Sequence, residues 1–242
     1  MTPARSLPRD EVHLWYTCLD FRVEVGGQGV SLLSAGERDR AARFHRNADR
    51  RRYVAAHAFL RRTLAQYLSL PAEALDFVEG SAGKPALTQM PGEPDLRFSL
   101  AHCGEHALVV VALGREVGVD GELMNLDVDA LALAEEVFPE AICTNLRALS
   151  GDARVRAFYR AWTRLEALLK ACGAGFTYEP RQVELPLNAC SPLQVDLTCG
   201  KAALAEQWTI CDLVLPEGLA GAVAAEGSCW RLTYMQMDAP LR

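Results

Sequence analysis

The sequence predicts an α+β protein made of two similar halves. Strand-like segments, helices and further strand-like segments follow one another in the same order twice along the chain. A hairpin-like segment also occupies the same place in each half, at 96–115 and at 207–226. We therefore divide the chain into an N-terminal half, 1–114, and a C-terminal half, 115–242. Two unrelated α+β domains would produce the same order of elements, and the sequence leaves this alternative open.

Capping and turn residues set the boundaries of the elements in the N-terminal half. Ser34, followed three residues later by Glu37, forms a capping box that predicts a short helix. Asn47 is the candidate cap of a longer, basic helix that runs to about Tyr67 with apolar residues at helical period. The glycines and the proline at 80–85 predict a loop. Strands are expected at 11–17, 75–79, 96–101 and 107–113. The continuous apolar run of the last strand indicates that both of its faces are covered.

The C-terminal half begins with an expected strand at 116–123 and continues with a helical composition from 127 to 150. Pro139 is expected to open a second short helix within this stretch. Asp152 is the candidate cap of a long helix that ends at Gly173. Further strands are expected at 181–187, 193–198, 207–215 and 229–236.

Composition restricts the class of protein. Of the 242 residues, 50% are hydrophobic and 23% are charged, which excludes a disordered tail, a coiled coil and a disulfide-stapled miniprotein. The net charge of -6 argues against a protein that coats nucleic acid. No apolar stretch approaches the roughly 20 residues of a membrane span, and the first residues lack the apolar core of a signal peptide. We therefore expect a cytoplasmic protein whose partners are neither membranes nor nucleic acids.

The first candidate for chemistry is a pair of carboxylates. Asp120 and Glu122 are two residues apart on an expected strand, so their side chains project from the same face. Two adjacent carboxylates repel each other unless a cation neutralises them, and Mg²⁺ favours such oxygen ligands. Taken alone, most pairs of this kind are a solvated strand face.

The second candidate is a helix. Trp162, Glu166 and Lys170 recur at intervals of four residues and therefore share one face, beside an apolar stripe. An exposed Glu–Lys pair next to a core stripe is the ordinary interpretation of this pattern. Trp162 weakens that interpretation because it extends the apolar surface onto the charged face. Glu166 and Lys170 could instead supply a third metal ligand and a cation that neutralises phosphate.

The third candidate is basic. Seven arginines lie between residues 38 and 52, Lys84 lies in the glycine loop, and His102 lies at the end of a strand. In an acidic chain this concentration indicates an anionic ligand, and arginines and free backbone amides suit the phosphates of a nucleotide. Several of the arginines must nevertheless belong to a solvated helix face, because they point in different directions around the helix.

Four ordered segments combine these candidates: Gly83-Lys84-Pro85, Phe98-Ser-Leu-Ala-His102, Gly118-Val-Asp120-Gly-Glu122 and the helix from Trp162 to Gly173. Together they resemble the Sfp-type 4′-phosphopantetheinyl transferases, which load carrier proteins with the phosphopantetheine arm of coenzyme A. The resemblance spans about residues 30–180. It implies a fold in which two similar α+β halves form a pseudo-dimer within one chain, with the active site between them.

The resemblance also implies roles for individual residues. Asp120, Glu122 and Glu166 would hold Mg²⁺, with Mn²⁺ as an alternative, and the metal would grip the diphosphate of coenzyme A. Lys170 and His102 would contact phosphate, and the loop formed by Gly83, Lys84 and Pro85 would cradle the adenine end. The candidates for the 3′-phosphate are Arg40, Arg46 and Arg52.

The implied reaction is the attack of a carrier-protein serine on the β-phosphorus of coenzyme A, with release of adenosine 3′,5′-bisphosphate. Glu166 is the candidate general base, and the candidate catalytic residues are Glu166, Lys170 and His102. The apolar residues of 124–138 are a candidate docking site for the carrier, although they suit a helix packed on its own core equally well. We expect a monomer. The alternatives are another Mg²⁺-dependent phosphotransferase or phosphohydrolase, and a catalytically weak module that binds carrier proteins.

Four positions depart from the pattern of the family. Ser99 and Ala101 replace a common asparagine and serine, so a side-chain hydroxyl next to His102 is missing. Leu165 stands where a lysine often precedes the glutamate, and Arg164 is a differently directed substitute. Gly121 replaces an apolar residue between the metal carboxylates, and it is expected to leave space beside the metal.

Overall fold

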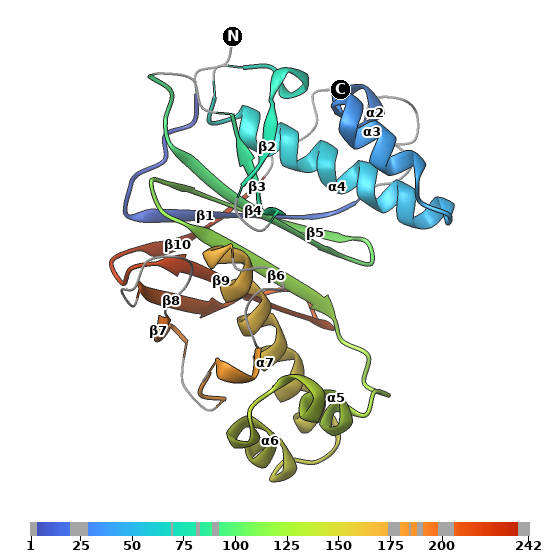
Figure 1. Cartoon of the computed structure of the whole chain (residues 1–242), viewed down its shortest axis with the longest axis vertical. Coiled ribbons are helices and arrows are strands. Elements are labelled where there is room, and N and C mark those ends of the chain that lie inside the picture. Colours follow the sequence, from blue (N-terminus) through green and yellow to red (C-terminus); the bar gives the residue numbers. More distant parts are fainter. Residues whose placement is uncertain are drawn as a thin grey trace.

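Two four-stranded sheets, each covered by one long helix, form the body of the protein (Figure 1). The computed structural model describes residues 4–19, 29–68, 70–80, 83–88, 92–173, 180–183, 185–187, 191–197 and 206–236. The first sheet has the strand order β10 (Arg231–Met235), β1 (Glu11–Cys18), β5 (His106–Leu113) and β4 (Leu96–Cys103). The second sheet has the order β6 (Val117–Leu123), β9 (Leu219–Glu226), β8 (Glu206–Asp212) and β7 (Leu193–Leu197). A small ribbon pairs β2 (Phe77–Glu79) with β3 (Pro85–Leu87).

The helices cover the outer faces of the two sheets. The first sheet is covered by α4 (Asn47–Ala65) and the second by α7 (Gly151–Cys172), so the layers run helix, sheet, sheet, helix (Figure 1). Shorter helices flank each long one: α2 (Gly29–Leu32) and α3 (Ala35–Ala42) beside α4, and α5 (Ala130–Val137) and α6 (Glu140–Arg147) at one end of α7. Single 3₁₀ turns are η2 (Ala72–Ala74) and η5 (Pro180–Gln182).

Strand β5 shows why the layers stack in this order. Val109 and Val111 pack against α4, whereas Leu108 and Val110 on the opposite face pack against β6 and β9. A strand whose two faces are both buried is apolar at every position, not only at alternate ones. The continuous apolar run in the sequence is thereby explained, and the expected strand with two covered faces is confirmed.

The last described strand crosses between the halves. Arg231–Met235 runs parallel to β1 and extends the first sheet, although its residues belong to the 115–242 segment. Apart from this strand, the first sheet is formed by residues before 114 and the second by residues after 115. The α+β fold of two similar halves is thus confirmed.

Most elements lie where the sequence predicted them, including the hairpin of β4 and β5. The capping box of α3 is also present: the side chains of Ser34 and Glu37 each accept a hydrogen bond from the backbone N–H of the other residue. Two caps were wrong. Arg46 precedes α4 and Asn47 is its first residue, while Ser150 precedes α7 and Asp152 lies inside the first turn.

Two further expectations about strands need correction. The segment 181–187 contains a 3₁₀ turn in place of the expected strand, and residue 184 lies outside the described residues. Pro85 begins the short strand β3, so the loop is shorter than expected, and its residues 81 and 82 also lie outside the described part. No helix among the described residues combines the length and the apolar character that crossing a bilayer requires.

Candidate active site

Strand β6 places two carboxylates on the side that faces α7. Val117 and Val119 point into the core between the two sheets, so the alternate residues Asp120 and Glu122 point the other way. Asp120 is only 5% exposed although it carries a charge. The sequence expectation that these two carboxylates share one face is confirmed.

Gly118 brings the strand unusually close to the helix. A Cβ atom at this position would overlap the backbone carbonyl of Ala167 and the backbone of Ala171, both on α7. Only glycine therefore allows β6 and α7 to approach so closely. This close approach places the carboxylates of the strand beside the polar face of the helix.

Two side chains of α7 bind the strand carboxylates directly. Lys170 Nζ donates to Asp120 Oδ1 at 2.7 Å, and Trp162 Nε1 donates to Glu122 Oε1 at 3.3 Å. The other carboxylate oxygen of Asp120, Oδ2, is buried and has no hydrogen-bond partner among the described residues. A buried carboxylate oxygen without a partner is costly, so this atom marks a place where a cation or a donor would be stabilised.

The carboxylates of this cluster destabilise one another's charges. Burial raises the pKa of Asp120, and the neighbouring Lys170 offsets part of that effect. Burial and the charge of Asp120 raise the pKa of Glu122, and the same two causes raise the pKa of Glu166. Glu166 therefore lies within electrostatic reach of the two strand carboxylates. A set of hard oxygen donors that repel one another is the chemistry that a divalent cation neutralises.

The side chains are not, however, arranged around a common point. Within the described residues, no group of three histidine, cysteine, aspartate or glutamate side chains is placed closely enough to hold a metal. One oxygen of Asp120 is bound to Lys170, and one oxygen of Glu122 is bound to Trp162. The donor set fits a divalent cation, whereas the present side-chain arrangement is that of an ion pair.

Basic side chains of the other half lie next to this cluster. His102 is the second-last residue of β4 and has access to solvent, yet partial burial and the neighbouring His57, Lys170 and Arg52 lower its pKa. These four basic side chains come from β4, α4 and α7, so they lie where the two halves meet. Together they form a region suited to an anion.

His57 was missed by the sequence analysis. Its Nδ1 lies 2.9 Å from Glu37 Oε1, and its ring stacks on Tyr53 with centroids 4.0 Å apart. Glu37 also binds Arg61, one helical turn after His57. His57 and Arg61 are four residues apart on α4 and therefore share one face of the helix. This spacing could have predicted that both bind the same carboxylate.

The three predicted phosphate-binding arginines differ in their surroundings. Arg40 and Arg46 are exposed near the end of α3 and the start of α4. Arg52 is half-buried, and its Nη1 donates to Asp49 at 2.9 Å. Its Nε is buried without a partner among the described residues. Of the three, the structure brings only Arg52 within electrostatic reach of His102.

The glycine-loop lysine lies at the junction of the two halves. Lys84 Nζ donates to Glu116 Oε2 at 2.7 Å and to the backbone carbonyls of Val117 and Ala171 at 3.0 and 2.9 Å. The loop therefore lies beside the start of β6 and the end of α7. The ammonium group binds protein acceptors, so nucleotide binding by this loop would depend on its backbone.

Three of the unusual positions have structural explanations. Ala101 is 4% exposed and packs in the core between the two sheets. Ser99 Oγ accepts a hydrogen bond from the backbone N–H of Val119 at 3.2 Å, which links β4 to β6. A Cβ at Gly121 would collide with Leu108, so the expectation of free space beside the metal was wrong. The residue points away from Asp120 and Glu122, because neighbours on a strand face opposite sides.

The fourth unusual position belongs to the core. Leu165 is 1% exposed, so a lysine there would be buried in the apolar cluster of this half. Arg164 does not replace such a lysine in the site. Its guanidinium binds Asp212 at 2.6 and 2.7 Å and the carbonyl of Pro186 at 3.1 Å.

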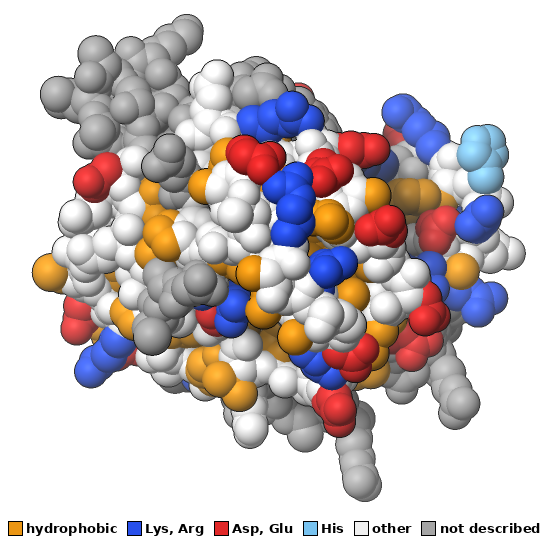
Figure 2. Space-filling model, turned by 90° about the horizontal axis from the view of Figure 1, so that it is seen from below, with side chains coloured by type: hydrophobic (Ala, Val, Ile, Leu, Met, Phe, Trp, Pro, Cys, Tyr) orange, Lys and Arg blue, Asp and Glu red, His pale blue; other side chains and the backbone are white. Residues whose placement is uncertain are grey.

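The segment 124–138 is only partly available to a partner. Phe138 is buried against Phe158, but Leu126 and Leu133 remain more than 40% exposed. Figure 2 shows the end of the molecule at which α5 and α6 lie, where acidic, basic and apolar side chains are interspersed. Core packing therefore describes Phe138, whereas Leu126 and Leu133 remain available to a partner.

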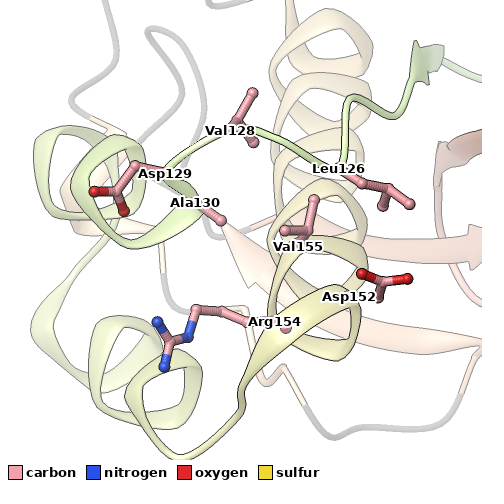
Figure 3. Close-up of a pocket in the computed structure, with 8 residues that line it drawn as sticks. Leu126, Val128, Asp129, Ala130, Asp152, Arg154 and Val155 are labelled. Carbon is pink, nitrogen blue, oxygen red and sulfur yellow. The ribbon is translucent and has the colours of Figure 1, made fainter.

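A hollow of about 210 Å³ lies between this segment and the first turns of α7 (Figure 3). Its lining residues are Leu126, Val128, Asp129, Ala130, Gly151, Asp152, Arg154 and Val155. Val155 and Lys170 are fifteen residues apart on one helix, which corresponds to roughly 22 Å. The hollow is therefore separate from the cluster of Asp120 and Lys170.

The fold agrees with comparisons to known proteins. A family model described as "4′-phosphopantetheinyl transferase superfamily" matches residues 116–224, and a model described as "4′-phosphopantetheinyl transferase, N-terminal" matches residues 27–114. The chain belongs to the 4′-phosphopantetheinyl transferase superfamily and is an enzyme of this class.

Individual relatives have the same activity in their names. The chain is 33% identical to the 4′-phosphopantetheinyl transferase HetI of Nostoc over 229 residues, which are 95% of this chain and 93% of that protein. It is 34% identical to a putative 4′-phosphopantetheinyl transferase of Synechocystis over 73% of this chain and 70% of the relative. The human L-aminoadipate-semialdehyde dehydrogenase-phosphopantetheinyl transferase is 25% identical over 69% of this chain and 56% of the human protein.

Proposed function

We propose that this chain transfers the 4′-phosphopantetheine arm of coenzyme A to a serine hydroxyl of an apo carrier protein, in a Mg²⁺-dependent reaction that releases adenosine 3′,5′-bisphosphate. The observation that carries the proposal is the meeting of β6 and α7. There Asp120, Glu122, Glu166 and Lys170 come within electrostatic reach of one another, and positive groups of the other half lie alongside.

Asp120, Glu122 and Glu166 would hold the metal. Asp120 Oδ2, which is buried and has no partner among the described residues, and the mutual repulsion of the three carboxylates support this assignment. Once bound, Mg²⁺ or Mn²⁺ would neutralise the negative charge of the diphosphate and favour the developing charge on its oxygens.

The residues of α7 would handle the proton and the phosphate charge. Burial and Asp120 raise the pKa of Glu166, which makes this carboxylate a stronger base than an exposed glutamate. Glu166 would accept the proton of the carrier serine as its oxygen attacks the β-phosphorus. The bond from that phosphorus to the bridging oxygen breaks, and adenosine 3′,5′-bisphosphate leaves. The ammonium of Lys170 would oppose the charge that develops on the phosphate oxygens.

The N-terminal half would bind the rest of coenzyme A. His102 and Arg52 are the nearest candidates for phosphate, since they lie in the positive region at the meeting of the halves. Arg40 and Arg46 are exposed and would reach the 3′-phosphate from the surface. The backbone of Gly83, Lys84 and Pro85 would cradle the adenine.

The carrier protein would dock near Leu126 and Leu133, the exposed residues of the candidate segment. A contiguous exposed apolar patch commonly marks a surface that binds a partner, and docking here would require Leu126 and Leu133 to be covered together. Because both halves of one chain supply the site, we further propose that the enzyme works as a monomer, and we expect it in the cytoplasm.

The direct test is to incubate the protein with coenzyme A, Mg²⁺ and a panel of apo carrier proteins, and to measure the intact mass of each carrier. Transfer predicts a gain of one phosphopantetheinyl group, which must disappear with a chelator and in Asp120→Asn. Hydrolysis of coenzyme A without any modified carrier would instead indicate a phosphohydrolase. Stable carrier binding without either reaction would indicate a binding module.

A further inference from the structure

Lys84 connects the nucleotide loop to both elements that carry the catalytic residues. Its three contacts go to the side chain of Glu116, the carbonyl of Val117 and the carbonyl of Ala171, at 2.7, 3.0 and 2.9 Å. Glu116 and Val117 begin the segment that continues into Asp120, and Ala171 follows Lys170. One ammonium group thus joins three parts of the site.

These contacts use the whole hydrogen-bonding capacity of the side chain. A lysine ammonium has three N–H donors and no acceptor, and each of the three donors here has an acceptor within hydrogen-bond distance. The side chain is only 18% exposed. No donor of Lys84 is left for a phosphate of a ligand.

The contact with Ala171 stabilises the end of the catalytic helix. The last four carbonyls of a helix have no partner within it, and they lie at the negative end of the helix dipole. Ala171 is one residue before the last residue of α7, so its carbonyl is one of these four. A cation at this place satisfies the carbonyl and complements the dipole.

The contact also lies beside the closest approach of the strand and the helix. Gly118, the residue after Val117, admits the backbone of Ala167 and Ala171 where any side chain would collide. Such tight packing fixes the distance between β6 and α7 but leaves sliding of one along the other to be restrained by directional bonds. The bonds of Lys170 to Asp120 and of Trp162 to Glu122 supply part of that restraint, and the three bonds of Lys84 add to it and extend it to the nucleotide loop.

We infer that Lys84 is a positioning residue, which fixes the strand of Asp120 and the helix of Lys170 relative to each other and to the nucleotide loop. This inference rests on the proposed function. It gives the lysine of the glycine loop a role in the geometry of catalysis in place of direct contact with coenzyme A.

Arg97 offers a matched control. Arg97 Nη1 donates to Glu116 Oε1 at 2.7 Å, and the side chain also binds Asp95. Arg97 and Lys84, both of the N-terminal half, therefore share Glu116, and the partners of Arg97 among the described residues are Asp95 and Glu116. Arg97→Gln removes one ion pair to Glu116 and leaves the two carbonyl contacts of Lys84 intact.

The test compares the full-length protein with Lys84→Met, Lys84→Arg and Arg97→Gln. Lys84→Met keeps the aliphatic stem and loses the ammonium. A small misplacement of catalytic groups lowers turnover about 10- to 100-fold, so kcat should fall by this factor while KM for coenzyme A changes less than about threefold. Lys84→Arg should recover part of kcat, because it retains charge and donors in a different geometry. Arg97→Gln should stay within about threefold of the unmodified protein.

Two measurements do not depend on turnover. Amide hydrogen exchange should become faster in 117–123 and in the last turn of α7 in Lys84→Met but not in Arg97→Gln. Calorimetric binding of coenzyme A without a carrier should change less than about threefold. If Lys84→Met does not fold, Lys84→Arg must show the same pattern with a smaller change.

The inference is overturned if KM and the dissociation constant for coenzyme A rise tenfold or more while kcat is retained, since Lys84 would then bind the ligand. Unchanged hydrogen exchange in both segments would also overturn it. Failure of the unmodified protein to modify any carrier would refute the proposed function instead, and the exchange and binding measurements would still decide the role of Lys84.

Discussion

The two long helices can be compared residue by residue because each contains a buried arginine. Arg61 of α4 is 0% exposed and Arg164 of α7 is 2% exposed. Each binds a carboxylate, Glu37 at 2.6 Å and Asp212 at 2.6 Å. Each also donates to the backbone of a later segment. Arg61 donates to the carbonyls of Ala72 and Leu75, and Arg164 donates to the carbonyl of Pro186. The two arginines therefore provide a common register for the halves.

When the two arginines are aligned, equivalent positions carry uncharged side chains in the first half and charged side chains in the second. The residues two and six positions after the arginine are Thr63 and Tyr67 in the first half, and Glu166 and Lys170 in the second. Tyr67 contacts the neighbouring strand through His13 at 2.8 Å and Trp15 at 2.7 Å. Lys170 contacts its strand through Asp120 at 2.7 Å.

This difference indicates which residues distinguish the half with the candidate catalytic groups from the other, similar half. The first half fills the space between strand and helix with Tyr67, Trp15 and His13, which hydrogen-bond through the Tyr67 hydroxyl, and with the Thr63 hydroxyl, which has no partner among the described residues. The second fills it with charges and leaves Asp120 Oδ2 without a partner among the described residues. Charge at two or three positions, rather than a different fold, thus decides which half would hold a metal, and the first half contributes through its surface at His102.

The largest expected effect tests the matched positions Glu166 and Thr63. Glu166→Gln removes the proposed base and a proposed metal ligand, so transfer should fall by about 10²- to 10⁴-fold while coenzyme A still binds. Thr63→Val removes a buried hydroxyl that has no partner in the described part of the chain, and it should leave the rate within about threefold. The measurement is the initial rate of carrier modification. Near-normal turnover of Glu166→Gln would refute its assignment.

The next effect concerns the buried arginines. Arg61→Met should lower the free energy of unfolding by about 3–5 kcal/mol, because the largely buried charge of Glu37 would lose its arginine partner. Arg164→Met should cost less, since the Asp212 side chain is 31% exposed and water can solvate it. Urea unfolding of both variants gives the comparison. Equal losses would show that the exposure of the carboxylate does not matter.

Glu37 gives a smaller effect that depends on pH. Burial raises its pKa, but hydrogen bonds from His57, Arg61 and Ser34 outweigh burial and lower the pKa from 4.5 to about 2. A pKa that is lower in the folded state stabilises the protein above pH 4.5, and this stabilisation is lost as the pH falls towards 2. Glu37→Gln keeps a capping box but cannot titrate.

The acid-induced loss of stability between pH 5 and pH 2 should therefore be smaller in Glu37→Gln, by on the order of 2 kcal/mol. Urea unfolding at several pH values measures this difference. Glu140→Gln is the control, because that glutamate pairs with Arg147 while its side chain is 75% exposed, and exposed pairs contribute little. Parallel curves for the unmodified protein and Glu37→Gln would contradict the prediction.

The smallest effect concerns the cluster formed by Tyr67, Trp15 and His13. Tyr67→Phe removes the hydroxyl that accepts from Trp15 and contacts His13, which should cost about 1–2 kcal/mol of stability. Transfer should be unaffected, because the cluster lies in the half without the proposed metal ligands. Thermal unfolding and the rate of carrier modification test the two statements separately. A large loss of rate would mean that the Tyr67 cluster takes part in the active site.

Much of the candidate site could be predicted from local sequence. The alternation of β6 places Asp120 and Glu122 on one face, and the helical period of α7 places Trp162, Glu166 and Lys170 on another. Periodicity is a property of the backbone, so it can be calculated from spacing alone. The capping box of Ser34 and the doubly buried strand β5 follow from the sequence for the same reason.

Only the tertiary structure decided which side chains meet across the chain. Lys84 binds Ala171, His57 lies near His102, and Arg164 turns into the core to bind Asp212. These partners are far apart in sequence, and their pairing depends on how the sheets stack and on the close approach that Gly118 permits. Spacing defines the face of an element, but packing decides what that face touches, because burial and the distance between elements are properties of the whole fold.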